Sequence, residues 1–226
     1  MLPGMDGTGR LFEPLSSALS GRLKSTVVAY SKTEPKPYTV LEKEVRARIR
    51  SLGNDVVVLG ESFSGPIAIR IASNPPPNLA AVVLVATFVR SPVTTFCRPF
   101  AQPLLFARPP PRTAIRHFLT GYDVDQHLLD AVHAAVKGIT PEVMATRARE
   151  ILSINVEAEF SAIELPMLFI AAKRDRLVKA KQQRLQALNP RLQWVEIDGP
   201  HLILQRAPEK TAEVISGFVG GVSKRP

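Results

Sequence analysis

One stretch, Asn54–Ser73, constrains the fold of this chain more than any other. It joins a short apolar run, Val56–Leu59, to Gly60 and Ser62, and then to apolar residues with helical spacing after Pro66. Four consecutive apolar residues, three of them β-branched, predict a strand that is buried on both faces. A strand, a sharp turn and a helix form the setting of the G-x-S-x-G nucleophile elbow, which lifts a serine hydroxyl above the strand end. A buried strand followed by a helix with a serine N-cap is the plainer alternative.

The elbow requires small residues two positions before and two positions after its serine. Those positions hold Gly60 and Ser64, so the second one is serine rather than glycine, and Gly65 follows it. Because loose serine motifs recur by chance, this pentapeptide alone favours the plainer alternative. The rest of the chain has to decide between the two.

The length and the cysteine content restrict the classes of protein that this chain can form. A chain of 226 residues can bury a core and fits one domain, with room for an inserted subdomain. No apolar run approaches the roughly 18 residues of a membrane span, and the first residues lack the features of a signal peptide. The single cysteine, Cys97, excludes an internal disulfide framework and a Cys-based zinc site. We therefore expect a cytoplasmic protein.

The net charge of +9 raises the question of nucleic-acid binding. The basic residues are dispersed, however, and the densest groups, at 46–50 and 173–184, contain neither interleaved aromatic residues nor a known binding motif. A solvated basic surface, with some steering of anionic substrates, explains this pattern better. We therefore expect no nucleic-acid partner.

Five apolar runs predict strands, and helical patterns alternate with them. The runs lie at Thr26–Tyr30, Val56–Leu59, Ala80–Ala86, Pro166–Ala172 and Leu192–Ile197. Helical spacing is found at residues 10–19, 39–52, 66–73, 179–188 and 207–219. Repeated βαβ units predict an α/β fold with a mostly parallel sheet that is covered by helices.

Residues 87–160 interrupt this alternation. They begin with many prolines and phenylalanines and continue with helical patterns at 112–120, 125–137 and 141–155, without a strand pattern. We interpret them as a helical lid that is inserted into a core made of residues 1–86 and 161–226.

Three residues of different chemistry follow three of the predicted strands: Ser62, Asp175 and His201. A nucleophilic serine needs a base that takes its proton, and the base needs a carboxylate that orients it. Because active groups of open α/β sheets lie at the carboxyl ends of strands, we predict that these three form a catalytic triad. Asp175 could instead cap a helix, His201 could be a core or turn histidine, and Asp198 is a second candidate for the acid.

The glycine-rich segment Pro3–Gly9 is the candidate for an oxyanion-binding loop. It lacks the Lys-Ser/Thr pair of a phosphate-binding loop, but it lets backbone N–H groups approach a developing negative charge. We expect the oxyanion donors to be the N–H groups of Met5 and of Phe63, which follows the serine. Asp6 is expected to shape the turn of the loop, and Glu61 to point away from the site.

The combination of these motifs resembles the α/β-hydrolases, and among them the small lidded carboxylesterases that include pimeloyl-ACP methyl ester esterase. The matching segments are Leu2–Gly9, Gly60–Gly65, Asp175 with Leu177–Val178, and Gly199–His201, and they span nearly the whole chain. The order Ser, Asp, His along the chain is the order of that superfamily. The first segment is also similar to plant acyltransferase-like hydrolases.

The resemblance implies a serine carboxylester hydrolase that acts on short- to medium-chain acyl esters and needs no cofactor and no metal. Acyltransferase or thioesterase activity on the same triad, and a non-catalytic ligand-binding relative, are the alternatives. The family carries one or two strands before the oxyanion loop that are absent here. It therefore implies a sheet of roughly six strands with an exposed edge, which could pair two copies in a homodimer. We expect an apolar substrate pocket lined by lid residues Phe88, Phe96, Phe100, Leu104, Leu105 and Phe106.

Overall fold

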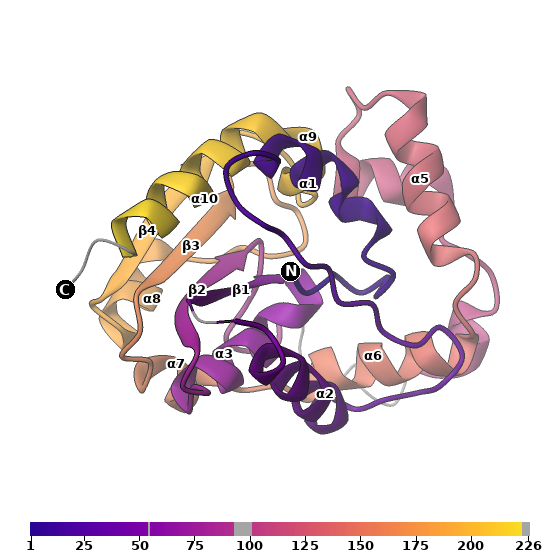
Figure 1. Cartoon of the computed structure of the whole chain (residues 1–226). Helices are drawn as coiled ribbons and strands as arrows, with labels where there is room; N and C mark the ends of the chain where they lie inside the picture. Colours follow the sequence, from indigo (N-terminus) through magenta and orange to yellow (C-terminus); the bar gives the residue numbers. More distant parts are fainter. Residues whose placement is uncertain (54, 93–100, 223–226) are drawn as a thin grey trace.

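A four-stranded parallel sheet lies at the centre of the computed structural model (Figure 1), which describes residues 1–53, 55–92 and 101–222. The strands lie side by side in chain order, and they are β1 (Val56–Glu61), β2 (Leu79–Val85), β3 (Met167–Ala172) and β4 (Leu192–Ile197). Each neighbouring pair is parallel. The two central strands, β2 and β3, are almost fully buried because helices cover both faces, which explains their continuous apolar sequence.

Two hydrophobic cores lie on the two faces of this sheet. The first contains residues of helices α2 (Tyr38–Arg50), α3 (Gly65–Ser73), α7 (Glu157–Ser161) and α8 (Gln182–Leu188). The second contains residues of α1 (Glu13–Leu19), α9 (Ile203–Arg206) and α10 (Pro208–Val222). A short 3₁₀ turn, η1 (Arg10–Phe12), leads into α1. The α/β class that the sequence predicts is therefore confirmed.

The segment between β2 and β3 projects to one side of the sheet (Figure 1). We call residues 87–160 the helical insertion. Its described helices are η4 (Pro103–Phe106), α4 (Arg112–Ile115), the π-helical turn η5 (Arg116–Thr120), α5 (Gln126–Val136), α6 (Pro141–Ser153) and most of α7. Leu129 and Val132 of α5 pack with Ile115 in a small third core. At its end, Val156 and Phe160 are buried in the first core, so this part of the insertion packs as part of the sheet domain.

Two predictions about the sheet are wrong. The sheet has four strands among the described residues rather than about six, and Thr26–Tyr30 is extended chain rather than a strand. That segment makes isolated backbone bonds: the Val28 N–H donates to the Met1 carbonyl at 3.0 Å, and the Tyr30 N–H donates to the Gly7 carbonyl at 2.7 Å. Because the neighbouring segment, which begins at Met1, turns into the glycine-rich loop, the two segments form no β-ladder.

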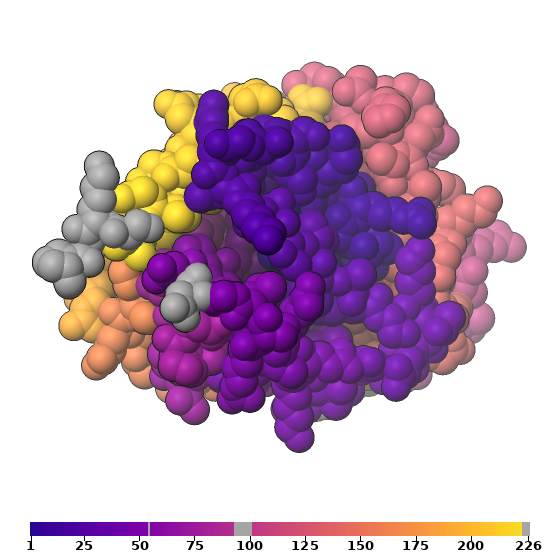
Figure 2. Space-filling view, in the orientation of Figure 1, coloured from indigo at the N-terminus to yellow at the C-terminus, as the bar shows by residue number. Residues whose placement is uncertain are grey.

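The edge of the sheet beside β1 is open along half of that strand. Leu2 forms one parallel bridge to Gly60 at the other half; its N–H donates to the Leu59 carbonyl at 2.8 Å. Within the described ranges, no strand continues this pairing toward Val56. A cavity of about 480 Å³ adjoins the open edge, between β1, the N-terminal residues and α10. In Figure 2 this face is hollowed between the yellow C-terminal helix and the indigo N-terminal residues.

Candidate active site

Ser62 lies in a strained turn directly after β1, at the start of the short 3₁₀ helix η2 (Ser62–Ser64). Its φ of 47° falls in the left-handed region, which is uncommon for a residue other than glycine. A Cβ at Gly60 would lie 2.8 Å from Ala68 Cβ, so only glycine fits before the turn. The strain and the close packing fit the nucleophile elbow that the sequence predicts.

The second close approach in this turn occurs at Gly65 rather than at Ser64. A Cβ at Gly65 would lie 1.9 Å from the Thr87 hydroxyl oxygen, and that hydroxyl donates a hydrogen bond to the Ser62 carbonyl at 2.5 Å. Gly65 therefore provides the space through which Thr87 reaches and fixes the backbone of the turn. This explains why the glycine is displaced by one position from the usual motif.

The imidazole of His201 lies between Ser62 and Asp175. Its Nε2 is 2.9 Å from Ser62 Oγ, and its Nδ1 is 2.7 Å from Asp175 Oδ2. The side chains of His201 and Asp175 are each 4% exposed, so water barely competes for the bond between them. The three residues come from the carboxyl ends of β1, β3 and β4, which a parallel sheet brings to one edge.

Asp175 is held in place by the chain that follows it. Its Oδ1 accepts hydrogen bonds from the backbone N–H groups of Leu177 at 2.8 Å and Val178 at 2.9 Å, which leaves Oδ2 to face His201. Asp198, the second candidate acid, is paired instead with Arg174 at 3.0 Å on the surface. Of the two carboxylates that the sequence offers as partners of His201, the structure thus places Asp175 beside the imidazole and Asp198 on the surface.

The loop Pro3–Gly9 lies beside Ser62. The Gly4 carbonyl accepts a hydrogen bond from the Gly7 N–H at 3.0 Å, and Gly7 has a φ of 68°. Because a trans peptide points its C=O and N–H in opposite directions, this turn directs the Met5 N–H away from Gly7. The Met5 N–H makes no hydrogen bond in the part of the chain that the structure describes. It is therefore free to donate to a ligand.

Phe63 supplies the second expected donor. Its N–H belongs to the first turn of η2, where backbone donors have no intrahelical partner. Its ring is fully buried and stacks on Tyr38 with ring centroids 4.7 Å apart, and the Tyr38 hydroxyl donates to the Phe63 carbonyl at 2.8 Å. These contacts hold the peptide that carries the donor.

Ser64 connects the turn at Ser62 to the loop Pro3–Gly9, a contact that the sequence analysis missed. Its buried hydroxyl donates to the Pro3 carbonyl and lies 2.7 Å from the Tyr30 hydroxyl, which is placed to donate to it. Burial raises the pKa of Tyr30, so its phenol keeps its proton. The only signal in the sequence was the serine in place of the second glycine of the motif.

Comparison with known proteins identifies the family of the chain. Residues 1–214 match the model of the alpha/beta hydrolase family. The chain belongs to this family. No curated protein sequence matches it closely enough to count as a relative.

Solved structures share the α/β-hydrolase fold at low sequence identity. A lipase-esterase related protein from Clostridium acetobutylicum has a TM-score of 0.78 and 15% identity, over 96% of this chain and 92% of that protein. An enol-lactonase from Burkholderia xenovorans has a TM-score of 0.77 and 16% identity, over 96% and 88%. A thermophilic esterase from Thermogutta terrifontis has a TM-score of 0.80 and 16% identity, over 95% and 86%. At such identities the likeness establishes the fold alone, and the narrower resemblance to pimeloyl-ACP methyl ester esterase stays a prediction.

A buried carboxyl group directly precedes Ser62 in this α/β-hydrolase. Glu61 is 3% exposed, and burial raises its pKa to about 7, although a hydrogen bond from Gln205 Nε2 at 3.0 Å partly opposes the shift. The nearby Asp6 carboxylate raises the pKa further, whereas His201 and the Gly4 backbone amide lower it. The Glu61 carboxyl packs against the glycine-rich loop, with Oε2 near Gly4, rather than pointing away from the site.

The raised pKa predicts that Glu61 makes stability depend on pH. Below about pH 4.5, the pKa of this carboxyl in the unfolded chain, the group is neutral in both the folded and the unfolded state. Between that pH and about pH 7, only the folded state keeps the proton. The free energy of unfolding therefore falls as the pH rises through this window. The total loss is about 3 kcal/mol. Glu61→Gln should therefore match the wild type at pH 4.5 in urea unfolding and exceed it at pH 8. Gln205 can turn to accommodate the amide, since its Oε1 has no partner among the described residues.

Glu164→Gln is the control for this prediction, because Glu164 is an exposed glutamate without a resolved ion pair in the described ranges. The free energy of unfolding of Glu164→Gln should equal that of the wild type at every pH. Parallel curves for the wild type and Glu61→Gln between pH 4.5 and 8 would contradict the prediction.

The expected substrate-binding residues of the insertion are dispersed. Phe88 is buried in the first core, Leu104 and Leu105 are 84% and 66% exposed, and Phe106 lines a cavity of about 230 Å³ with Met144. Phe96 and Phe100 lie outside the described residues. Leu104 and Leu105 face solvent because η4 is a short surface turn with no buried residue. No group of three His, Cys, Asp or Glu side chains that could hold a metal occurs in the described part of the chain.

Proposed function

We propose that this α/β-hydrolase is a serine carboxylester hydrolase that acts through an acyl-enzyme. One observation carries the proposal: a continuous hydrogen-bonded series runs from Asp175 through His201 to Ser62, whose backbone is strained into an elbow. Base, nucleophile and orienting acid are the minimal set for activating a hydroxyl at neutral pH. The Met5 and Phe63 amides lie on the loop and helix that flank this hydroxyl, where they can act as oxyanion donors.

The proposed reaction has two halves. His201 Nε2 takes the proton of Ser62 Oγ, which attacks the ester carbonyl, and the Met5 and Phe63 amides stabilise the resulting oxyanion. The tetrahedral intermediate collapses to the acyl-enzyme as His201 gives its proton to the leaving alcohol. Water, deprotonated by His201, then attacks the acyl-enzyme. As the second tetrahedral intermediate collapses, His201 returns the proton to Ser62 Oγ, and the acid and free Ser62 are released. Asp175 keeps the proton of His201 on Nδ1 and stabilises the imidazolium.

We further propose that the helical insertion acts as a lid over the site and selects short- to medium-chain acyl groups, with Phe106 among its apolar contacts. A panel of p-nitrophenyl esters from acetate to palmitate, together with a thioester and an acceptor alcohol, tests the activity and the alternatives. Esterase turnover that peaks between two and eight carbons is the expected result. Dominant transfer to the alcohol would make the protein an acyltransferase, and dominant thioester cleavage a thioesterase. No turnover on any member would contradict the proposal and favour a non-catalytic ligand-binding relative.

We propose separately that the open edge of the sheet pairs with a second copy of the chain. The half of β1 near Val56 can pair with the same strand of a second copy, which would give a homodimer. Sedimentation of the purified protein should then show a dimer at micromolar concentration, and a monomer at all concentrations would contradict it. Among the described residues, no helix has the length and hydropathy to cross a membrane.

A further inference from the structure

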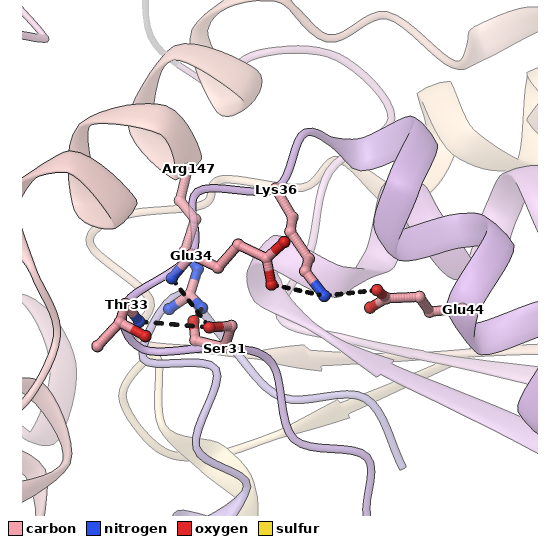
Figure 3. Close-up of polar contacts among 6 residues, drawn as sticks. All are labelled: Ser31, Thr33, Glu34, Lys36, Glu44 and Arg147. Carbon is pink, nitrogen blue, oxygen red and sulfur yellow. Dashed lines mark hydrogen bonds and ion pairs between the residues drawn. The ribbon is translucent and has the colours of Figure 1, made fainter.

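An arginine of the helical insertion is buried against the oxyanion loop. Arg147 lies on α6 and is 3% exposed. Its Nη1 donates to the Met5 carbonyl at 2.8 Å and to the Asp6 carbonyl at 3.0 Å, and its Nη2 donates to the Ser31 carbonyl at 2.8 Å. Figure 3 shows the side chain reaching from its helix to Ser31. One guanidinium thus joins the insertion to two separate loops of the sheet domain.

The surroundings of Arg147 are built to hold it. Its guanidinium lies over the ring of Tyr30, 5.9 Å from the centroid, which is cation–π range. Gly7 has a left-handed backbone, and a Cβ there would lie 2.6 Å from Nη2. Burial lowers the pKa of Arg147, while the Asp6 carboxylate raises it. In the described residues its hydrogen bonds go to backbone carbonyls, with no carboxylate in direct contact. A buried cation in this setting is costly unless its geometry is well satisfied.

The contacts of Arg147 bear on the direction of the Met5 N–H. That N–H belongs to the Gly4–Met5 peptide, and Arg147 holds the two peptides that follow, through the carbonyls of Met5 and Asp6. Ser64 holds the Pro3 carbonyl on the other side. The donor peptide is therefore fixed from both flanks while its own N–H stays unpaired. The positive charge also lies one peptide from the donor, where it favours a developing oxyanion.

We propose that Arg147 is a positioning residue for the oxyanion donor Met5, so that the helical insertion supplies part of the catalytic apparatus of the sheet domain. This rests on the proposed esterase function. Arg147 does not touch the substrate; it acts by holding the loop that does. The role differs from that of a lid that only covers the site.

The test compares Arg147→Lys with a control on the same helix. Lysine keeps the charge but cannot donate to three carbonyls in the fixed geometry of a guanidinium. The control is Glu150→Gln, since Glu150 Oε2 accepts from the Tyr38 N–H at 2.8 Å and so anchors α6 without contacting the oxyanion loop. With p-nitrophenyl acetate, Arg147→Lys should lower kcat by about 10- to 100-fold and change KM less than threefold. Glu150→Gln should stay within about threefold for both constants.

A transition-state mimic separates positioning from a merely structural role. A trifluoromethyl ketone adds to Ser62 and forms an oxyanion, whereas the matching methyl ketone binds without forming one. Arg147→Lys should weaken inhibition by the first about as much as it lowers kcat/KM and leave inhibition by the second unchanged. A lower melting temperature with unchanged kcat and unchanged inhibition by the trifluoromethyl ketone would overturn the proposal.

Hydrogen exchange of the loop keeps the test independent of the esterase proposal. Backbone amides of residues 4–8 should exchange at least 10-fold faster in Arg147→Lys than in the wild type and in Glu150→Gln, with α3 unchanged. An inactive wild type with this exchange pattern would refute the esterase function and leave the anchoring intact. Equal exchange in all three proteins would refute the anchoring whatever the activity.

Discussion

Replacing Ser62 with alanine is expected to lower kcat for p-nitrophenyl acetate by about 10⁵- to 10⁶-fold, to the level that binding and the oxyanion donors alone can sustain. The hydroxyl of Ser62 is the group whose oxygen lies 2.9 Å from His201 Nε2, so its loss removes both the nucleophile and the proton that the base accepts. Alanine keeps a Cβ and can occupy the left-handed turn as serine does. Steady-state kinetics and the melting temperature, measured on the same preparation, report the two effects separately.

Ser73→Ala provides the matched control for that loss. Ser73 ends α3, the helix that follows Ser62, and within the described part of the chain its hydroxyl bonds only to the Arg70 carbonyl, at 3.0 Å. Its replacement should leave kcat within twofold. Turnover by Ser62→Ala that stays within 10-fold of the wild type would show that another group performs the reaction.

Asp175→Asn is expected to lower kcat by about 10³- to 10⁴-fold with little change in KM. The amides of Leu177 and Val178 both donate to Oδ1, so an asparagine should keep its oxygen there and turn its NH₂ toward His201. That NH₂ cannot accept the proton of Nδ1. The imidazole would then carry its proton on Nε2, where it faces Ser62 as a donor and cannot act as the base. Activity should therefore be lost although the folded structure is kept.

Asp198→Asn is the control for this prediction. Asp198 precedes His201 by three residues and pairs with Arg174 on the surface. Its ion pair is exposed, so its loss should cost at most about 1 kcal/mol of stability, and kcat should stay within twofold. If Asp198→Asn were the more damaging of the two, the orienting acid would have been assigned to the wrong residue.

Much of the fold could be predicted from the sequence because buried parallel strands appear in it as short, continuous apolar runs. β2, β3 and β4 are short apolar runs between turn signals, and their predicted bounds agree with the structure to within a residue. The three residues at the strand ends follow from the same reasoning, since parallel strands bring their carboxyl ends to one edge. Local sequence and global topology agree at these positions.

The failures lie where tertiary contacts decide the outcome. Thr26–Tyr30 has the composition of a strand, yet it lies beside a glycine-rich loop that offers no ladder. In the sequence, Ser64 is only a departure from a motif, whereas in the structure its hydroxyl joins two loops that are distant in sequence. The sequence contains one feature that indicates a buried Arg147. This residue follows the buried Val143 by four positions and precedes the half-buried Ile151 by four, so a cation occupies the apolar face of α6.

The residues of the site lie on different parts of the structure. The sheet carries Ser62, Asp175 and His201, and the glycine-rich loop carries Met5. Side chains from three further places, Ser64, Glu61 and Arg147, pack against or hold that loop. The proposed catalysis therefore depends on these contacts to the loop as well as on the three residues of the predicted triad.

The most direct test of the central claim is the identification of the residue that becomes covalently modified. Intact-mass and peptide mass spectrometry after treatment with a fluorophosphonate probe should show a single adduct on Ser62, absent in Ser62→Ala and at least 100-fold slower to form in His201→Gln. An adduct on any other side chain, or no adduct on a folded wild-type protein, would contradict the account.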